Sequence, residues 1–219
     1  MERHHFETDL QALKNRLLNM GAMVEERVHG AIQALMERNL EAAEAIAHGD
    51  EEVNALQIEI DDRCIKLLAL QQPMASDLRL ITSAMKINAD LERIGDQAVN
   101  IAQRALELNR EAQLKPYIDL PRMAERAQRM VKESLDAFVA RDTQLARQVC
   151  GEDAAVDALK EQIFRELLTF MMGDTSTIPR AIRLILISRF LERVADHATN
   201  IAEMVIYMVE SKMVRHTLA

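Results

Sequence analysis

The sequence is poor in aromatic residues, glycine, proline and cysteine. Aromatic residues make up 3% of its 219 residues, tryptophan is absent, and there are only 6 glycines, 4 prolines and 2 cysteines. Few turn residues are therefore available to separate short strands. The chain is instead rich in alanine, leucine, glutamate, arginine and methionine, which are strong helix formers. We therefore expect an all-α protein.

Long apolar runs and dense basic runs are also missing. The longest apolar stretches, such as the one from Leu184 to Ile187, are far too short to span a bilayer, and the N-terminal residues lack the apolar region of a signal peptide. The net charge is −8 without a basic cluster, so nucleic acid is a poor partner and cations suit this surface better. We expect a cytoplasmic protein without direct membrane insertion, which reaches a membrane only through a partner.

The two cysteines lie far apart, inside helical patterns. Isolated cysteines of this kind are more often small buried side chains in a reducing compartment than disulfide partners. We therefore expect Cys64 and Cys150 to be free thiols.

An internal repeat dominates the chain. Residues 90–102 read DLERIGDQAVNIA and residues 190–202 read FLERVADHATNIA, and segments 38–43 and 50–56 resemble segments 141–146 and 153–159. Packing alone would duplicate only the apolar positions, whereas here acids and an asparagine are duplicated too. The repeat predicts two tandem three-helix bundles with six long helices, over residues 1–113 and 114–219, joined by a linker at 114–117.

Local signals place the helices of the first half at about residues 7–37, 50–70 and 76–109, with a short helical turn after Asn39. Asn39 and Asp142 are typical N-caps, and we expect Gly49 and Gly151 to form left-handed turns. Apolar residues at alternating spacings of four and three predict a buried seam along the third helix of each half. The two seams are Leu80, Ala84, Ile87, Leu91, Ile94, Ala98, Ile101 and Ala105, and Leu184, Ile187, Leu191, Val194, Ala198, Ile201 and Val205.

Oxygen-bearing side chains form a second row on the same helices. Glu92, Asp96 and Asn100 follow one another at four-residue steps, which drift by about 40° each, roughly opposite the seam. If each hairpin bends at its predicted turn, acids of the preceding helix fall level with this row. The candidate metal ligands are thus Glu92, Asp96, Asp50, Asn54 and Asn100 in the first half, and Glu192, Asp196, Asp153, Asp157 and Asn200 in the second.

Acids concentrated in this way repel one another unless a cation lies between them. The ion could be iron, Mg²⁺, Mn²⁺ or Zn²⁺, and an all-oxygen ligand set favours the first three over a closed thiolate zinc site. Asn54 stands where the second half has Asp157, so we expect the first site to bind more weakly. His197 is expected to pack or cap rather than to ligate. The competing interpretation is a solvated helix face on which Glu92 pairs with Lys86 or Arg93.

Residues 73–79 (PMASDLR), together with the two Leu-Glu-Arg-x-x-Asp phrases, resemble the PhoU family, and the resemblance covers essentially the whole chain. It implies two three-helix bundles, a homodimer or higher oligomer, and surface metal clusters held by Glu/Asp-x-x-x-Asp motifs. It also implies a negative regulator that couples the phosphate ABC transporter to its sensor histidine kinase, and that restrains uptake and the starvation response when phosphate is plentiful. The second half lacks an equivalent of residues 73–79.

Two other functions remain open. The first is a structural helical adaptor without metal, in which the acids only solubilise the bundle. The second is a di-metal carboxylate oxidoreductase, which needs Glu-x-x-His motifs from two helices; the bundle body offers only Glu26 with His29. No glycine-rich phosphate loop occurs, and no serine or cysteine is spaced to pair with a base, so we expect a protein that is not an enzyme.

Overall fold

The computed structural model describes residues 2–71 and 73–212, and within these ranges it contains helices and no strand. Six long α-helices and one short one are joined by brief connections. They are α1 (Glu2–Met36), α2 (Leu40–His48), α3 (Glu51–Gln71), α4 (Ala75–Asn109), α5 (Asp119–Ala140), α6 (Thr143–Gly173) and α7 (Ile178–Glu210), with a 3₁₀ turn, η1 (Thr175–Thr177), before α7. The all-α fold and the helical repeat are confirmed.

The corner after the first helix is built in the same way in both repeats. Arg38 and Arg141 both adopt the left-handed conformation with φ of 56°. The next residue then has two tasks. The N–H groups of Asn39 and Asp142 close the previous helix onto the carbonyl groups of Ala34 and Ala137, both at 2.9 Å. Their side chains accept N–H groups of the following helix and cap it.

The expectation that Gly49 and Gly151 form left-handed turns is wrong. No described glycine has a positive φ. Gly49 caps α2 with φ of −97°, and Gly151 lies inside α6, which runs unbroken where the first repeat is divided into α2 and α3. A single glycine costs a helix only about 1 kcal/mol, which packing along a helix of this length overrides.

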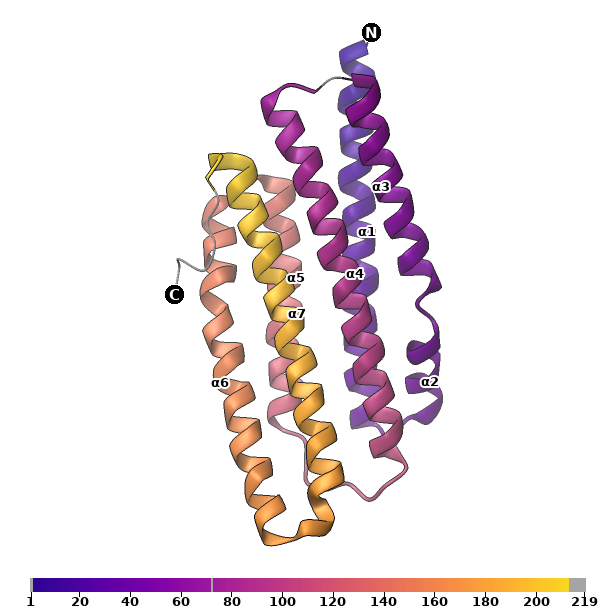
Figure 1. Ribbon diagram of the computed structural model, residues 1–219, viewed down its shortest axis with the longest axis vertical. Coiled ribbons are helices and arrows are strands. Elements are labelled where there is room, and N and C mark those ends of the chain that lie inside the picture. The colour runs from indigo at the N-terminus through magenta and orange to yellow at the C-terminus, as the bar shows by residue number, and fades with distance from the viewer. Residues whose placement is uncertain (1, 72, 213–219) are drawn as a thin grey trace.

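The two repeats lie side by side and run antiparallel (Figure 1). α4 and α7 pack against each other at the centre, α3 flanks α4, and α6 flanks α7. α1 and α5 lie behind this layer and also contact each other. In the order α3–α4–α7–α6, equivalent helices of the two repeats therefore occupy equivalent positions, with α4 and α7 at the centre and α3 and α6 outside. Residues at equivalent places in α4 and α7 come together near the middle of the molecule.

The predicted seams form the core. All the seam residues of α4 and α7 are buried in one core with apolar side chains of α1 and α5, among them Leu17, Met20, Met130 and Phe138. Burying an aliphatic side chain of this size contributes about 1.5 to 3 kcal/mol. The apolar pattern thus fixes which face of each central helix turns inward. Within the described ranges, no helix is both long enough and apolar enough to cross a membrane.

Candidate functional site

Asp96 and Asn100 of one oxygen-rich row, and their counterparts Asp196 and Asn200, line one cavity between the repeats. This central groove has a volume of about 620 Å³ and lies where α4 and α7 cross. Its lining includes equivalent residues of the two repeats together with Asp50 from the start of the first hairpin. The lining residues are Asp50, Arg93, Asp96, Gln97, Val99, Asn100, Arg193, Asp196, His197 and Asn200. The sequence predicted two separate surface sites, whereas the antiparallel packing brings parts of both into a single groove.

In the first repeat, the acids meet an arginine from their own helix. Arg93 Nη1 lies 3.0 Å from Asp96 Oδ2, and its Nε lies 3.5 Å from Glu92 Oε2. Asn54 donates its amide N–H to Asp50 at 3.0 Å. Partial burial raises the pKa of Glu92, the negative charges of Asp96 and Asp50 raise it further, and Arg93 opposes the shift. The charge of Asp50, which directly precedes α3, thus reaches Glu92 on α4, as expected if the hairpin brings acids of the two helices level.

In the second repeat, a lysine bridges the two helices. Lys160 donates hydrogen bonds to Asp157 on its own helix and to Glu192 on α7. The bond to Glu192 contributes most to raising the pKa of Lys160. The pKa of Asp196 is raised first by desolvation and then by the charges of Asp153, Glu192 and Asp157. Four acids are therefore concentrated here, and Lys160 neutralises part of their charge.

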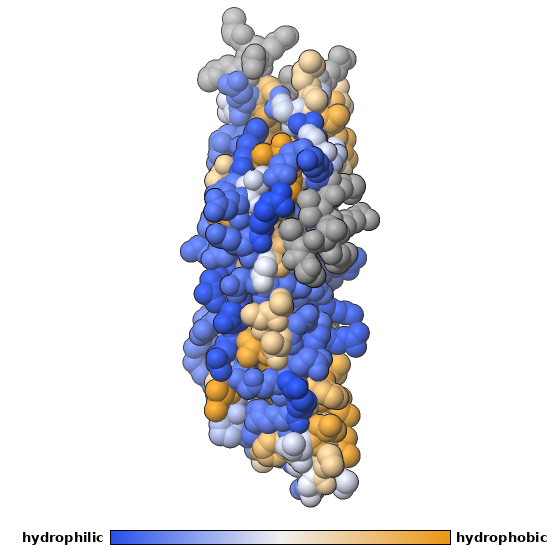
Figure 2. All heavy atoms as spheres, turned by 90° about the vertical axis from the view of Figure 1, so that its left-hand side faces the viewer, coloured by the Kyte–Doolittle hydropathy of each residue, from blue (hydrophilic) through white to orange (hydrophobic). Residues whose placement is uncertain are grey.

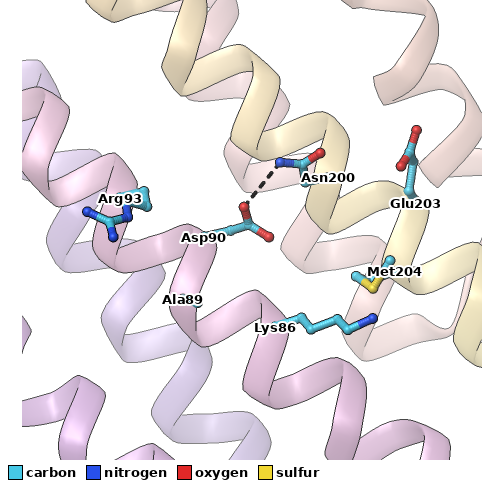
Figure 3. A pocket seen from close by; sticks show the side chains of 7 residues that line it. All are labelled: Lys86, Ala89, Asp90, Arg93, Asn200, Glu203 and Met204. Atoms are coloured by element: carbon cyan, nitrogen blue, oxygen red, sulfur yellow. Dashed lines mark hydrogen bonds between the residues drawn. The ribbon is translucent and has the colours of Figure 1, made fainter. Parts of the chain in front are cut away.

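Asp90 joins the two repeats beside the central groove. Its Oδ1 accepts a hydrogen bond from the Asn200 amide at 3.2 Å (Figure 3). The same oxygen lies 2.9 Å from Nδ1 of His197. Asp90 and Asn200 also border a second cavity of about 520 Å³ between α4 and α7, into which Lys86 extends. The Lys86 ammonium lies 5.9 Å from the centroid of the Tyr207 ring. His197 and Asn200 thus contribute to the contact between the repeats.

The rows are less exposed than their position opposite the seam predicted. The side chains of Glu92 and Glu192 are only 20% and 23% exposed, because the neighbouring helices and the basic side chains cover them. Asp96 and Asp157 are more open, at 35% and 51%. The carboxylates therefore line the flanks of grooves between helices, where charge is screened less than on an open face.

The donor types suit a hard cation, but the side-chain positions do not form a ready-made cage. Across residues 2–71 and 73–212, no three Asp, Glu, His or Cys side chains are grouped so that they could hold a metal ion. Lys160 pairs with Glu192 and Arg93 with Asp96, so their positive charges already occupy the places beside the carboxylates that an ion would take. An ion would therefore have to displace these two side chains. Glu26 and His29, the only Glu-x-x-His motif considered above, are exposed on α1.

Lys160 and Asp90 are the residues of this region that the sequence did not identify. Lys160 stands three residues after Asp157, so helical spacing could have paired them. Its contact with Glu192 depends on the register of α6 and α7. Asp90 has no acidic counterpart, since Phe190 occupies the equivalent place, and its role depends on how the two repeats pack.

Comparison with known proteins connects the repeat to one family. A model of the PhoU domain matches residues 17–105 and again residues 120–205. The chain belongs to the PhoU family. Each match covers most of one repeat, so the duplicated helical unit seen in the fold is the PhoU domain itself.

Full-length relatives in the PhoU family carry a common description. The "Phosphate-specific transport system accessory protein PhoU homolog" of Pseudomonas aeruginosa is 41% identical over 97% of this chain and 90% of its own length. The PhoU accessory protein of Escherichia coli is 35% identical over 96% and 88%. The crystal structure of PhoU from Pseudomonas aeruginosa matches with a TM-score of 0.90 over 94% of this chain and 100% of its own, at 41% identity. A "phosphate transport system regulatory protein PhoU" from Streptococcus pneumoniae also gives 0.90, over 96% of this chain and 99% of its own, at 32% identity.

Proposed function

We propose that this protein is a cytoplasmic negative regulator of phosphate uptake and of the phosphate-starvation response. It would act by contacting the phosphate ABC transporter and the sensor histidine kinase, without catalysing a reaction itself. The observation that carries the proposal is its membership of the PhoU family, whose relatives are named as accessory proteins of phosphate-specific transport. Long helices with grooves on their outer faces provide surfaces for such contacts.

Deletion of the gene in a bacterium grown with ample phosphate tests the regulatory role. A reporter of the phosphate-starvation response should rise in the deletion strain and return to its repressed level when the gene is restored. Uptake of radiolabelled phosphate should rise in parallel. An unchanged reporter together with unchanged uptake would contradict the proposal.

We also propose that the two acidic sets bind metal ions once Lys160 and Arg93 turn aside. Glu192, Asp196, Asp153 and Asp157 would hold an ion in the second repeat, while Glu92, Asp96 and Asp50 with Asn54 would do so in the first. Burial is the main cause of the raised pKa values of Glu92 and Asp196, and neighbouring carboxylates raise both values further. A bound cation would relieve this repulsion between carboxylates, which supports the proposal. The ion would lower the free energy of the charged carboxylates and fix the hairpins relative to each other.

Metal content after purification without chelators measures this directly, and calorimetry with Mn²⁺, Mg²⁺ and Fe²⁺ gives affinities. Replacing Glu192 by Gln and Asp196 by Asn should abolish binding in the second repeat. Glu161→Gln, an exposed change on α6 that lies outside the acidic set, is the matched control and should bind as the unchanged protein does. Equal binding in all three proteins would exclude this site.

A structural adaptor without metal is the second candidate. It is favoured by the ion pairs that already compensate the acids, above all the bridge from Lys160 to Asp157 and Glu192. This function predicts that the reporter phenotype persists when metal binding is lost. We propose a homodimer in either case, which light scattering of the purified protein tests.

A further inference from the structure

The outer face of α6 carries a stripe of exposed side chains that no described helix covers. The members of this outer stripe are Ala154, Ala158, Glu161, Arg165, Leu168 and Met172, and all of them are exposed. They follow one another at alternating steps of four and three residues, which keeps each within about 40° of one line along the helix. The buried residues Ile163 and Leu167 lie on the opposite side, where α6 packs on α5 and α7. The outer stripe therefore has the spacing of a helix–helix contact, but the partner helix is missing.

The position of α6 leaves this stripe accessible. α6 lies at one edge of the molecule (Figure 1), and Figure 2 looks onto that edge and shows hydrophobic patches between hydrophilic ones over its lower half. Leu168 is 40% exposed and Met172 80% exposed. Glu161 and Arg165, the two charged members, form no ion pair with another described residue. Both the charges and the large apolar side chains are thus free to contact a second surface.

The outer stripe is complementary in charge to a second copy of itself. Two α6 helices can lie antiparallel with the contact centred on residue 163. Since antiparallel helices pair residues at equal distances on either side of the centre, Glu161 of each copy then faces Arg165 of the other. The contact thus contains two identical pairs of opposite charge. Because the same surface is used by both copies, such a contact is isologous and closes with two chains.

The apolar members match in the same register. Ala158 faces Leu168, and Ala154 faces Met172, so that a small side chain leaves room for a large one in each layer. Phe164 borders the stripe, is 43% exposed, and directly follows the centre of the contact. The two copies of Phe164 therefore approach each other beside the two-fold axis, where they add apolar contact area.

The equivalent face of α3 provides the contrast. Ile58 and Asp62 stand at the positions of Glu161 and Arg165, and both are exposed. In the corresponding antiparallel contact Ile58 would face Asp62, which would bury a carboxylate against an aliphatic side chain without a partner. The first repeat therefore exposes a stripe with the same spacing that is not complementary to itself. Self-complementarity is a property of α6.

We propose that α6 forms a two-fold interface with α6 of a second copy of this chain, antiparallel and centred on residue 163. The proposal rests on the homodimer proposed above and names the surface that forms it. The second copy is the occupant because charge and side-chain size both match when the outer stripe meets itself reversed. The contact requires neither a metal ion nor phosphate.

Sedimentation equilibrium of the full chain tests the interface through two charge reversals. Glu161→Arg places arginines opposite each other, and Arg165→Glu places glutamates opposite each other. Each variant alone should therefore dimerise about tenfold more weakly than the unchanged protein, or worse. An equal mixture of the two variants should restore the dimer, because each copy then meets the opposite charge on its partner. Phe164→Ala should weaken the dimer without being rescued in this way.

Asp62→Arg, an acid-to-arginine reversal on the exposed face of α3, is the matched control and should leave the dimer unchanged. Circular dichroism checks that each variant keeps its helix content. A chain that sediments as a monomer would contradict the homodimer itself. A dimer that neither reversal weakens would retain the homodimer but overturn its assignment to α6, and a mixture that fails to restore the dimer would overturn the antiparallel pairing. Weakening by Asp62→Arg would assign the contact to α3 instead. The regulatory role is measured separately by the starvation reporter, so the failure of one proposal does not imply the failure of the other.

Discussion

Individual basic side chains determine the electrostatic state of the acidic sets. Lys160 bridges Asp157 and Glu192, and Arg93 pairs with Glu92 and Asp96. These pairs are partly exposed, so each stabilises the fold by only about 1 kcal/mol or less. These basic side chains nevertheless affect metal binding, because a metal ion entering either acidic set must compete with the Lys160 ammonium or the Arg93 guanidinium for the carboxylates. The repeats differ here, since Gln57 stands at the position equivalent to Lys160.

Lys160→Gln makes the second set resemble the first and removes the competing ammonium. We expect the affinity for Mn²⁺ to rise about three- to tenfold, corresponding to roughly 1 kcal/mol for a partly exposed pair. Isothermal titration calorimetry gives the value. Lys66→Gln, an exposed change on α3, serves as the control. An affinity that stays the same or falls in Lys160→Gln would show that Lys160 does not compete with an ion.

The thiol of Cys64 offers a test of burial and of pH dependence. Burial, with a smaller contribution from Asp61, raises the pKa of Cys64 from 9.0 to about 12. The unfolded chain therefore loses this proton near pH 9 while the folded chain keeps it. The free energy of unfolding should fall as the pH rises above about 9.

At pH 8 the native thiol should carry roughly 1,000-fold less thiolate than the unfolded one, and should react correspondingly slowly with iodoacetamide. Cys150→Ala leaves Cys64 as the single thiol, so mass spectrometry can follow the reaction with and without guanidinium chloride. A native rate within tenfold of the unfolded rate would be inconsistent with the buried position.

Helix ends were predicted well where a side chain caps the backbone and poorly where only a glycine suggested a break. Asn39 and Asp142 mark helix starts in both repeats as their chemistry indicates. The left-handed residues are Arg38 and Arg141 instead of the glycines. The corner needs a left-handed residue directly before the cap, and the sequence places an arginine there. The geometry of the connection therefore outweighs the preference of arginine for a negative φ.

Replacing Arg141 by Gly should stabilise the protein by about 0.5 to 1 kcal/mol, because glycine adopts the left-handed conformation without the steric cost of a side chain. Urea unfolding followed by circular dichroism measures the change. Arg38→Gly should bring no net gain. The Arg38 guanidinium donates hydrogen bonds to the carbonyl groups of Asn109 (2.8 Å) and Glu111 (2.5 Å), and these would be lost. Equal stabilisation by both changes would show that these bonds contribute nothing.

In the molecule as a whole, the arrangement of the repeats explains why the sequence predicted only part of the site. Apolar periodicity predicted each bundle, since the seam determines which face of a helix is buried. Hairpin register predicted which acids lie level within a repeat. Nothing in either pattern states that α4 and α7 run antiparallel against each other, so the shared central groove and the contact of Asp90 with His197 and Asn200 could not be foreseen.

The same arrangement predicts how the protein unfolds. The connection between α4 and α5 separates the two repeats in sequence, but α4 packs on α7 and α1 on α5 across that boundary. Arg183 adds ion pairs to Glu107 at 2.6 Å and to Glu111 at 2.9 Å. An interface that contains the central helix of each repeat should couple their stabilities. We therefore expect the full chain to unfold in one cooperative transition.

Urea denaturation can be followed by circular dichroism at 222 nm for all helices and by tyrosine fluorescence for two local probes. Tyr117 lies in the connection between the repeats and Tyr207 lies on α7, so a Tyr117→Phe variant isolates the second repeat. The curves should coincide. Asp90→Ala removes the partner of His197 and Asn200 without changing the seams, and should shift the common midpoint to lower urea while the curves still coincide. Two separated transitions in the unchanged protein would mean that each repeat is stable alone, and that the central groove forms by docking of two independent domains.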